Sequence, residues 1–225
     1  SVLYVGKRRV AEKGPHSIPL VALGTGLLWF GWYGFNAGSE LQVDEITSLA
    51  FLNTDIAASF AAMTWLLLEW SRVRKPRFVG LLTGAVAGLA TITPAAAYVP
   101  TWGAAVIGFA AGFVCYWAVE MKNKLGWDDA LDVWGVHGVG GALGIIMLGL
   151  IGSTAVNAAG ADGLFFGGSE FFMKQVVAVM GSSVYAFGFT WGMLWLIDRI
   201  VPVKTTEEME RTLDEALHGE QAYLA

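Results

Sequence analysis

The sequence has little cysteine and little charge. One cysteine, Cys115, in 225 residues excludes a disulfide framework and any zinc site built on cysteine ligands. Only 15% of the residues are charged and 55% are hydrophobic, whereas an ordinary soluble domain has roughly 25% charged residues. The net charge is −5, and no segment combines basic patches with stacking aromatics, which excludes a nucleic-acid-binding protein. The composition therefore indicates an all-α polytopic membrane protein.

The sequence does contain long apolar runs of about 20 residues, the length that crosses a bilayer as a helix. The runs cover residues 18–38, 46–70, 78–98, 103–121, 132–152 and 171–197. Because short loops join them, residues 1–200 are expected to form one transmembrane domain. Pro94 lies in the third run and predicts a kink or a helix end there. Residues 201–225 are polar and are expected to form a cytoplasmic segment that begins with a helix capped by Thr205 or Thr206.

The basic residues fall on one side of these six spans. Thirteen of the 14 Lys and Arg residues lie in alternate loops or in the tail, and Lys174 is the exception. Since cytoplasmic loops carry the excess of Lys and Arg, the C-terminus is predicted to be cytoplasmic. The six residues before Lys7 are typical of the end of an earlier helix, because they cover only about 9 Å. With no initiator Met, the sequence is interpreted as the second part of a longer membrane protein.

His137 is the strongest candidate for chemistry, because it lies inside the fifth apolar run. An ionisable residue within a span is costly and indicates function by default, although a neutral histidine hydrogen-bonded between helices is the alternative. Gly135, Gly138, Gly140 and Gly141 surround it with little bulk, which suits either a close-packed helix or a narrow lumen. A lone neutral imidazole offers one donor and one acceptor. It therefore suits a proton or a small polar solute better than a metal ion.

The end of the first apolar run contains a second group of candidates. Leu28, Trp32, Phe35 and Ser39 follow i, i+4, i+7, i+11 spacing and are expected to share one helical face. On that face Phe35 would be an apolar plug, and Ser39 a polar acceptor beside aromatics that attract cations. An interfacial aromatic belt is the other interpretation. Asn36 is expected to hydrogen-bond either a neighbouring helix or an opened backbone carbonyl.

Several other residues are interpreted as structural. Asp132 precedes the fifth span and suits a helix N-cap. Asn53 and Asp55 are expected to face the bundle interior or a partner subunit. Small residues four apart predict close helix packing. They are Gly34/Gly38, Gly80/Gly84/Gly88, Gly108/Gly112 and Gly140/Gly144.

Four stretches resemble the Amt/Mep/Rh ammonium transporters, in particular bacterial and archaeal Amt proteins. They are GWYGFNAGSE, TITPAAAYV, DVWGVHGVGGALG and HGEQAY, and the likeness runs over essentially the whole chain. The resemblance implies an eleven-helix bundle built from two inverted halves and assembled as a homotrimer, with one pore in each subunit and no cofactor. This chain would be the second half of that bundle, from the end of helix five to the cytoplasmic tail. The N-terminal half would be missing.

The resemblance also implies roles for individual residues. His137 corresponds to the second of two pore histidines, Phe35 to the inner phenylalanine of the outer gate, and Ser39 to the serine of the external ammonium site. Asn36 fits the motif without a definite role. The apolar pore-lining positions near the histidines correspond to Leu28, Trp32 and Val133. The acid at the start of helix ten corresponds to Asp132.

The function that the resemblance implies is transport of ammonium or ammonia through a hydrophobic, histidine-lined pore in the cell membrane. Deprotonation would give selectivity, because neutral ammonia can cross an apolar constriction that no alkali cation can follow. The tail and the basic loops resemble the surface that family members present to a PII signal protein. An ammonium sensor or a split transporter fragment is the alternative. An intramembrane enzyme is disfavoured, because the single membrane histidine has no paired nucleophile or metal set.

Overall fold

The computed structural model describes residues 1–10 and 14–220, and these ranges contain helices but no strand. Two sets of residues used in the sequence analysis lie outside the described ranges: Lys13, one of the basic residues, and residues 221–225 at the end of the expected cytoplasmic segment. Five helical segments in these ranges are long and apolar enough to cross a membrane. They are α2 (Ile18–Asn36) with the short helix η1 (Gly38–Glu40), α3 (Glu45–Val73), α5 (Thr101–Leu125), the π-helix η2 (Trp134–Val139) with α6 (Gly140–Ile151), and α7 (Ser169–Asp198). The prediction of an all-helical membrane fold is confirmed.

The third apolar run forms a shorter helix than the sequence predicts. Helix α4 (Phe78–Ile92) has 15 residues, about 22 Å at 1.5 Å per residue, against a hydrocarbon core about 30 Å thick. It ends two residues before Pro94, which has no backbone N–H to continue the helical hydrogen bonds. The chain continues through turns, where the fully buried Asn53 of α3 donates its amide to the carbonyls of Ala96 (2.8 Å) and Val99 (2.9 Å). A polar side chain from a neighbouring helix thus satisfies irregular backbone at membrane depth.

Small residues let α3, α4 and α5 approach one another closely. A Cβ added at Gly88 would lie 2.5 Å from the carbonyl oxygen of Ala57, and one added at Gly108 would lie 2.4 Å from the same oxygen. The packing prediction is confirmed for the glycines of α4, α5 and α6. Gly34 and Gly38 have no neighbour within 4 Å in the described part of the chain, so close packing at this pair stays a prediction.

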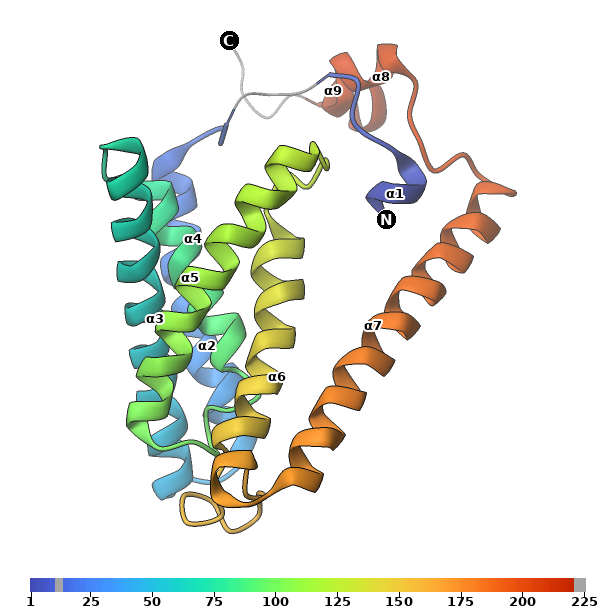
Figure 1. Ribbon diagram of the computed structural model, residues 1–225. Coiled ribbons are helices and arrows are strands. Elements are labelled where there is room, and N and C mark those ends of the chain that lie inside the picture. The colour runs from blue at the N-terminus through green and yellow to red at the C-terminus, as the bar shows by residue number, and fades with distance from the viewer. Residues whose placement is uncertain (11–13, 221–225) are drawn as a thin grey trace.

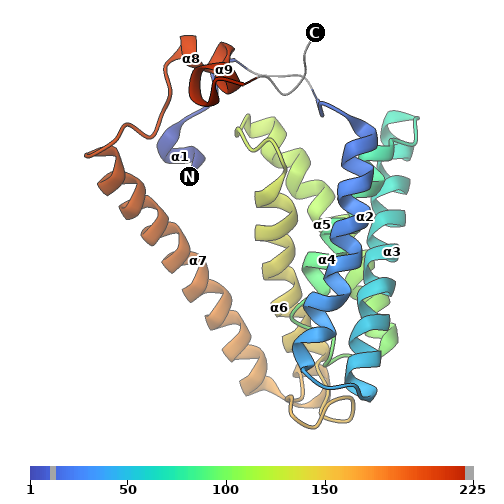
Figure 2. The same cartoon turned by 180° about the vertical axis from the view of Figure 1, so that it is seen from behind.

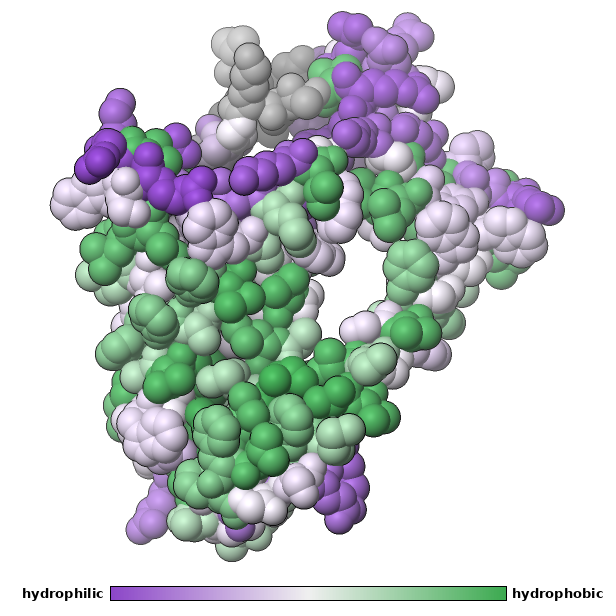
Figure 3. All heavy atoms as spheres, viewed as in Figure 1, coloured by the Kyte–Doolittle hydropathy of each residue, from purple (hydrophilic) through white to green (hydrophobic). Residues whose placement is uncertain are grey.

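Helix α7 diverges from the other membrane helices (Figures 1 and 2). Among the described elements it packs mainly on α6 and on the short helix η3 (Leu164–Phe166), and Tyr4 near the start of the chain contacts its far end. It has no buried residue. The space-filling view shows an opening between α7 and the rest of the chain, with apolar residues around it (Figure 3). The protein therefore has an open side between α7 and the bundle.

The short helices α1 (Val2–Val5), α8 (Glu207–Arg211) and α9 (Leu213–His218) lie together at one end of the bundle, near the loop between α5 and η2 (Figure 1). Helix α8 begins as the sequence predicts. The side chain of Thr206 caps it by accepting a hydrogen bond from the backbone N–H of Met209 at 3.3 Å. Hydrophilic residues gather at this end and at the opposite end, with apolar sides between them (Figure 3).

Candidate functional site

His137 lies in the π-helix η2, at the start of the span that continues as α6. Such segments are rare in proteins and frequent at functional sites, and the apolar pattern of the sequence did not predict this one. The imidazole is exposed in this chain, and Trp32 of α2 stacks on it with ring centroids 6.4 Å apart and 23° between the planes. Two regions of sequence that were expected to line one pore therefore lie side by side.

The glycines around His137 divide into two groups. A Cβ at Gly135 would lie 2.7 Å from a side-chain carbon of α5, and one at Gly140 would lie 2.9 Å from the Thr91 hydroxyl oxygen of α4. A Cβ at Gly141 would have no neighbour within 4 Å. The sequence left close packing and an open lumen as alternatives. The structure has close packing on the side of η2 and α6 that faces α4 and α5, and free space at Gly141.

Trp32 is held in place by the segment that follows α4. Its indole N–H donates to the hydroxyl oxygen of Thr93 at 2.8 Å, and Phe35 packs edge-on against its ring with centroids 5.7 Å apart. Phe35 is 64% exposed and Leu28 is also exposed. Thr93 was not among the predicted site residues, although it belongs to the TITPAAAYV stretch. Thr93 couples the aromatic face of α2 to the irregular backbone after α4.

A cavity of about 280 Å³ lies at the C-terminal end of α2, and its lining includes Phe35, Asn36, Ser39, Glu40 and Tyr98. Ser39 is in η1, the short helix that follows the end of α2 at Asn36, and it lines the same cavity as Phe35. The Ser39 hydroxyl donates to the carbonyl oxygen of Asn36 at 2.9 Å, which leaves the lone pairs of the hydroxyl oxygen available to an N–H donor. Glu40 and Tyr98 were not among the predicted site residues.

Asn36 is buried and joins α2 to α3. Its side-chain amide donates to the Thr54 hydroxyl oxygen at 3.0 Å, and Thr54 in turn donates to the carbonyl oxygen of Ala50 at 2.6 Å. The expected hydrogen bond to a neighbouring helix is confirmed. The amide oxygen of Asn36 has no hydrogen-bond partner among the described residues.

The N-cap prediction for Asp132 is wrong, and the residue that caps the helix, Asp129, was not among the predicted residues. The carboxylate of Asp129 accepts from the backbone N–H groups of Val133 (3.1 Å) and Trp134 (2.8 Å). Asp132 has a φ of +55°, a left-handed conformation, and its carboxylate pairs with the ammonium group of Lys122 on α5 at 2.5 Å. An acid directly before a helix looks like a cap in sequence. The left-handed conformation of Asp132 lets its carboxylate bind Lys122 of α5 instead.

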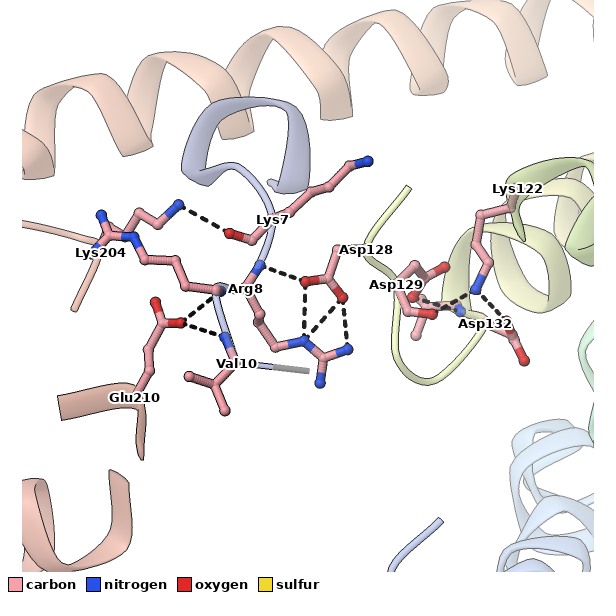
Figure 4. A network of polar contacts seen from close by, with 11 residues as sticks. Lys7, Arg8, Val10, Lys122, Asp128, Asp129, Asp132, Lys204 and Glu210 are labelled. Atoms are coloured by element: carbon pink, nitrogen blue, oxygen red, sulfur yellow. Dashed lines mark hydrogen bonds and ion pairs between the residues drawn. The ribbon is translucent and has the colours of Figure 1, made fainter. Parts of the chain in front are cut away.

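A network of polar contacts ties the beginning of the chain to the loop after α5 and to the tail (Figure 4). The guanidinium and backbone N–H of Arg8 both donate to the carboxylate of Asp128, at 2.7 Å for the shortest contact of each. These hydrogen bonds hold the pKa of Asp128 below its usual range. The Glu210 carboxylate of α8 accepts from the backbone N–H groups of Arg9 (2.8 Å) and Val10 (3.4 Å), which lowers its pKa.

The sequence profile of the Ammonium Transporter Family matches residues 1–223. The chain belongs to this family. It is 43% identical to an ammonium transporter of Bacillus subtilis (strain 168), covering 98% of this chain and 55% of that protein. Its structure is similar to that of Candida albicans Mep2, with a TM-score of 0.84 at 36% identity, covering 92% of this chain and 48% of that one.

A third similarity is to the structure of a sensor Amt protein, with a TM-score of 0.85 at 28% identity over 96% of this chain and 55% of that one. The predicted family is confirmed, and it is a family of transporters rather than of enzymes. This family member spans about half the length of the curated relatives that it matches.

Proposed function

We propose that this chain forms half of an ammonium transporter pore, along the face shared by α2 and η2. The observation that carries the proposal is that this face is uncovered although it is apolar: Phe35 is 64% exposed and Val133 is 48% exposed, beside the exposed ring of His137. Exposed apolar side chains alone are ordinary on a membrane helix, whereas an exposed ionisable ring within a span indicates a functional face. Since the relatives are about twice as long as this chain, we infer that a complementary N-terminal half closes the pore.

Transport of ammonium requires discrimination against potassium, which has a similar size and the same charge. In our proposal Ser39 accepts a hydrogen bond from ammonium at the outer mouth, where the rings of Phe35 and Trp32 add cation–π attraction. Ammonium then transfers a proton to solvent water at the mouth, and neutral ammonia passes Phe35, because an unpaired cation is far more costly than a neutral molecule in an apolar site. The imidazole of His137 offers a donor and an acceptor to the ammonia or to the released proton.

We further propose that the complete protein is a homotrimer in the cell membrane, with α8 and α9 on the cytoplasmic side. The orientation is supported by the basic residues, of which thirteen of 14 fall on that side. Residues 1–200 then form the membrane domain and residues 201–225 the cytoplasmic segment. That segment and the basic loops would offer a docking surface to a PII signal protein.

The test is flux in proteoliposomes that contain this chain alone or with a complementing N-terminal half, with ammonium-dependent current and potassium leak recorded together. Selective current only after complementation supports the proposal. His137→Ala should then abolish transport or its selectivity, whereas His218→Ala, on the exposed helix α9, should leave both unchanged. Selective current from this chain alone would contradict the two-half pore. Unchanged selective flux in His137→Ala would contradict the role of the histidine.

An ammonium sensor is the second candidate, and the similarity to the structure of a sensor Amt protein favours it. A sensor would bind ammonium at the outer site around Ser39 and pass no current. Ammonium-dependent thermal stabilisation of the complemented protein, lost in Ser39→Ala and accompanied by no measurable flux, would support the sensor over the transporter.

A further inference from the structure

Lys122, near the end of α5, is a buried charged residue that the proposed mechanism does not use. It is 4% exposed. Its ammonium group donates to the carboxylate of Asp132 at 2.5 Å and to the backbone carbonyl of Asp129 at 2.8 Å (Figure 4). Lysine is almost never fully buried unless it is paired. Here both partners belong to the turn that precedes η2.

The two partners of Lys122 are the residues that start the helix of His137. The Asp129 side chain caps the helix through the N–H groups of Val133 and Trp134. The Asp132 carbonyl accepts the first helical hydrogen bond, from the N–H of Val136 at 2.9 Å. Lys122 therefore holds the side chain of Asp132 and the main chain of Asp129.

The backbone of this turn requires such support. The left-handed conformation of Asp132 is costly for a residue with a Cβ and persists only where the surroundings enforce it. The carboxylate of Asp132 forms an ion pair with Lys122. The turn is also braced by a ring contact between Trp127 and Trp134, whose centroids lie 5.1 Å apart. Helical backbone runs without interruption from Val133 to His137. A change in the turn is therefore transmitted to the imidazole.

We propose that Lys122 is a positioning residue for His137. By fixing the turn at Asp129 and Asp132, it sets the rotation of η2 and hence the stacking of the imidazole on Trp32. The flux readout of this inference rests on the proposed transport function. The geometry of the imidazole is measured independently of transport.

The experiment compares four variants of the chain in lipid nanodiscs, together with the complementing half. They are Lys122→Met, Lys122→Arg, Asp132→Asn and, as a matched control, Lys124→Met, which removes an exposed lysine from the same helix turn. The first readout is the ring ¹⁵N spectrum of His137 in histidine-labelled protein, assigned by its disappearance in His137→Ala. The second is the ratio of ammonium current to potassium leak.

Lys122→Met should shift the His137 ring signals and lower selective current roughly tenfold to hundredfold, because small misplacements of a functional group have effects of that size. Lys122→Arg should restore both, since arginine keeps the charge and the donors, and Lys124→Met should match the unchanged protein. If Lys122→Met does not fold, shifted signals in Asp132→Asn with normal signals in Lys122→Arg support the proposal.

His137 signals that are the same in Lys122→Met, or in Asp132→Asn, as in the unchanged protein would overturn the positioning role. His137→Ala separates this outcome from failure of the transport proposal. Wild-type selective flux in His137→Ala refutes the transport role of the histidine, while the ring spectrum still reports whether Lys122 sets its geometry.

Discussion

Replacing Gly144 with alanine measures how closely α6 must approach the end of α4. The added Cβ would lie 2.0 Å from the carbonyl oxygen of Thr91 and 3.1 Å from the ring of Pro94. Since carbon–oxygen contacts lie at about 3.3–3.6 Å, the helices would have to separate locally by more than about 1 Å. Overpacking of this kind costs about 1–3 kcal/mol, and the better helix propensity of alanine offsets only about 1 kcal/mol. Because neither obstacle can rotate away, we take the cost at the upper end of this range, about 3 kcal/mol, and expect a net destabilisation of about 2 kcal/mol.

The assay is thermal unfolding of the purified chain in lipid nanodiscs, where about 2 kcal/mol corresponds to a fall of roughly 4–8 °C in Tm for a chain of this size. Gly141→Ala is the matched control on the same helix, because its Cβ would have no neighbour within 4 Å. We expect Gly141→Ala to equal the unchanged protein or to exceed it slightly. A Gly144→Ala protein as stable as Gly141→Ala would refute the argument from close helix contact.

Three further outcomes are expected. Asn53→Leu should lower the free energy of unfolding by roughly 2 kcal/mol or more, since it strands two buried carbonyls; an unchanged Tm would contradict this. Arg8→Gln should cost up to about 1 kcal/mol at neutral pH. Because the folded-state pKa of Asp128 is lowered, that cost should shrink as the pH falls from about 4 through the lowered pKa, as unfolding at several pH values would report. Glu210→Gln should make the tail more sensitive to limited proteolysis, and the exposed Glu208→Gln should not.

The membrane helices followed from the sequence because run length and hydrophobicity are local properties. The ends of α3 and α5 lie a few residues from those predicted, and the end of α4 follows from the fixed ring of Pro94. The pairing of Trp32 with His137 came from the family resemblance, because no spacing rule joins residues 105 positions apart. These parts of the fold and of the site were predictable.

The remaining features depend on backbone geometry that residue patterns do not encode. A π-helix differs from an α-helix in hydrogen-bond register while keeping nearly the same apolar pattern, so η2 was not predicted. Asp129 rather than Asp132 caps the helix because the backbone of Asp132 is left-handed. The bond from Trp32 to Thr93 requires the chain after α4 to turn back, which becomes visible only in three dimensions.

The shortness of α4 also bears on how the protein enters the membrane. Helices are made in chain order, so Asn53 of α3 is synthesised before the carbonyls that it will satisfy exist. Until residues 93–100 arrive, a polar amide would face lipid without a partner, and α4 alone does not reach across the bilayer. The insertion machinery should therefore release α3, α4 and the turn after α4 into the lipid as one unit. The order of synthesis and the order of insertion then differ for this part of the chain.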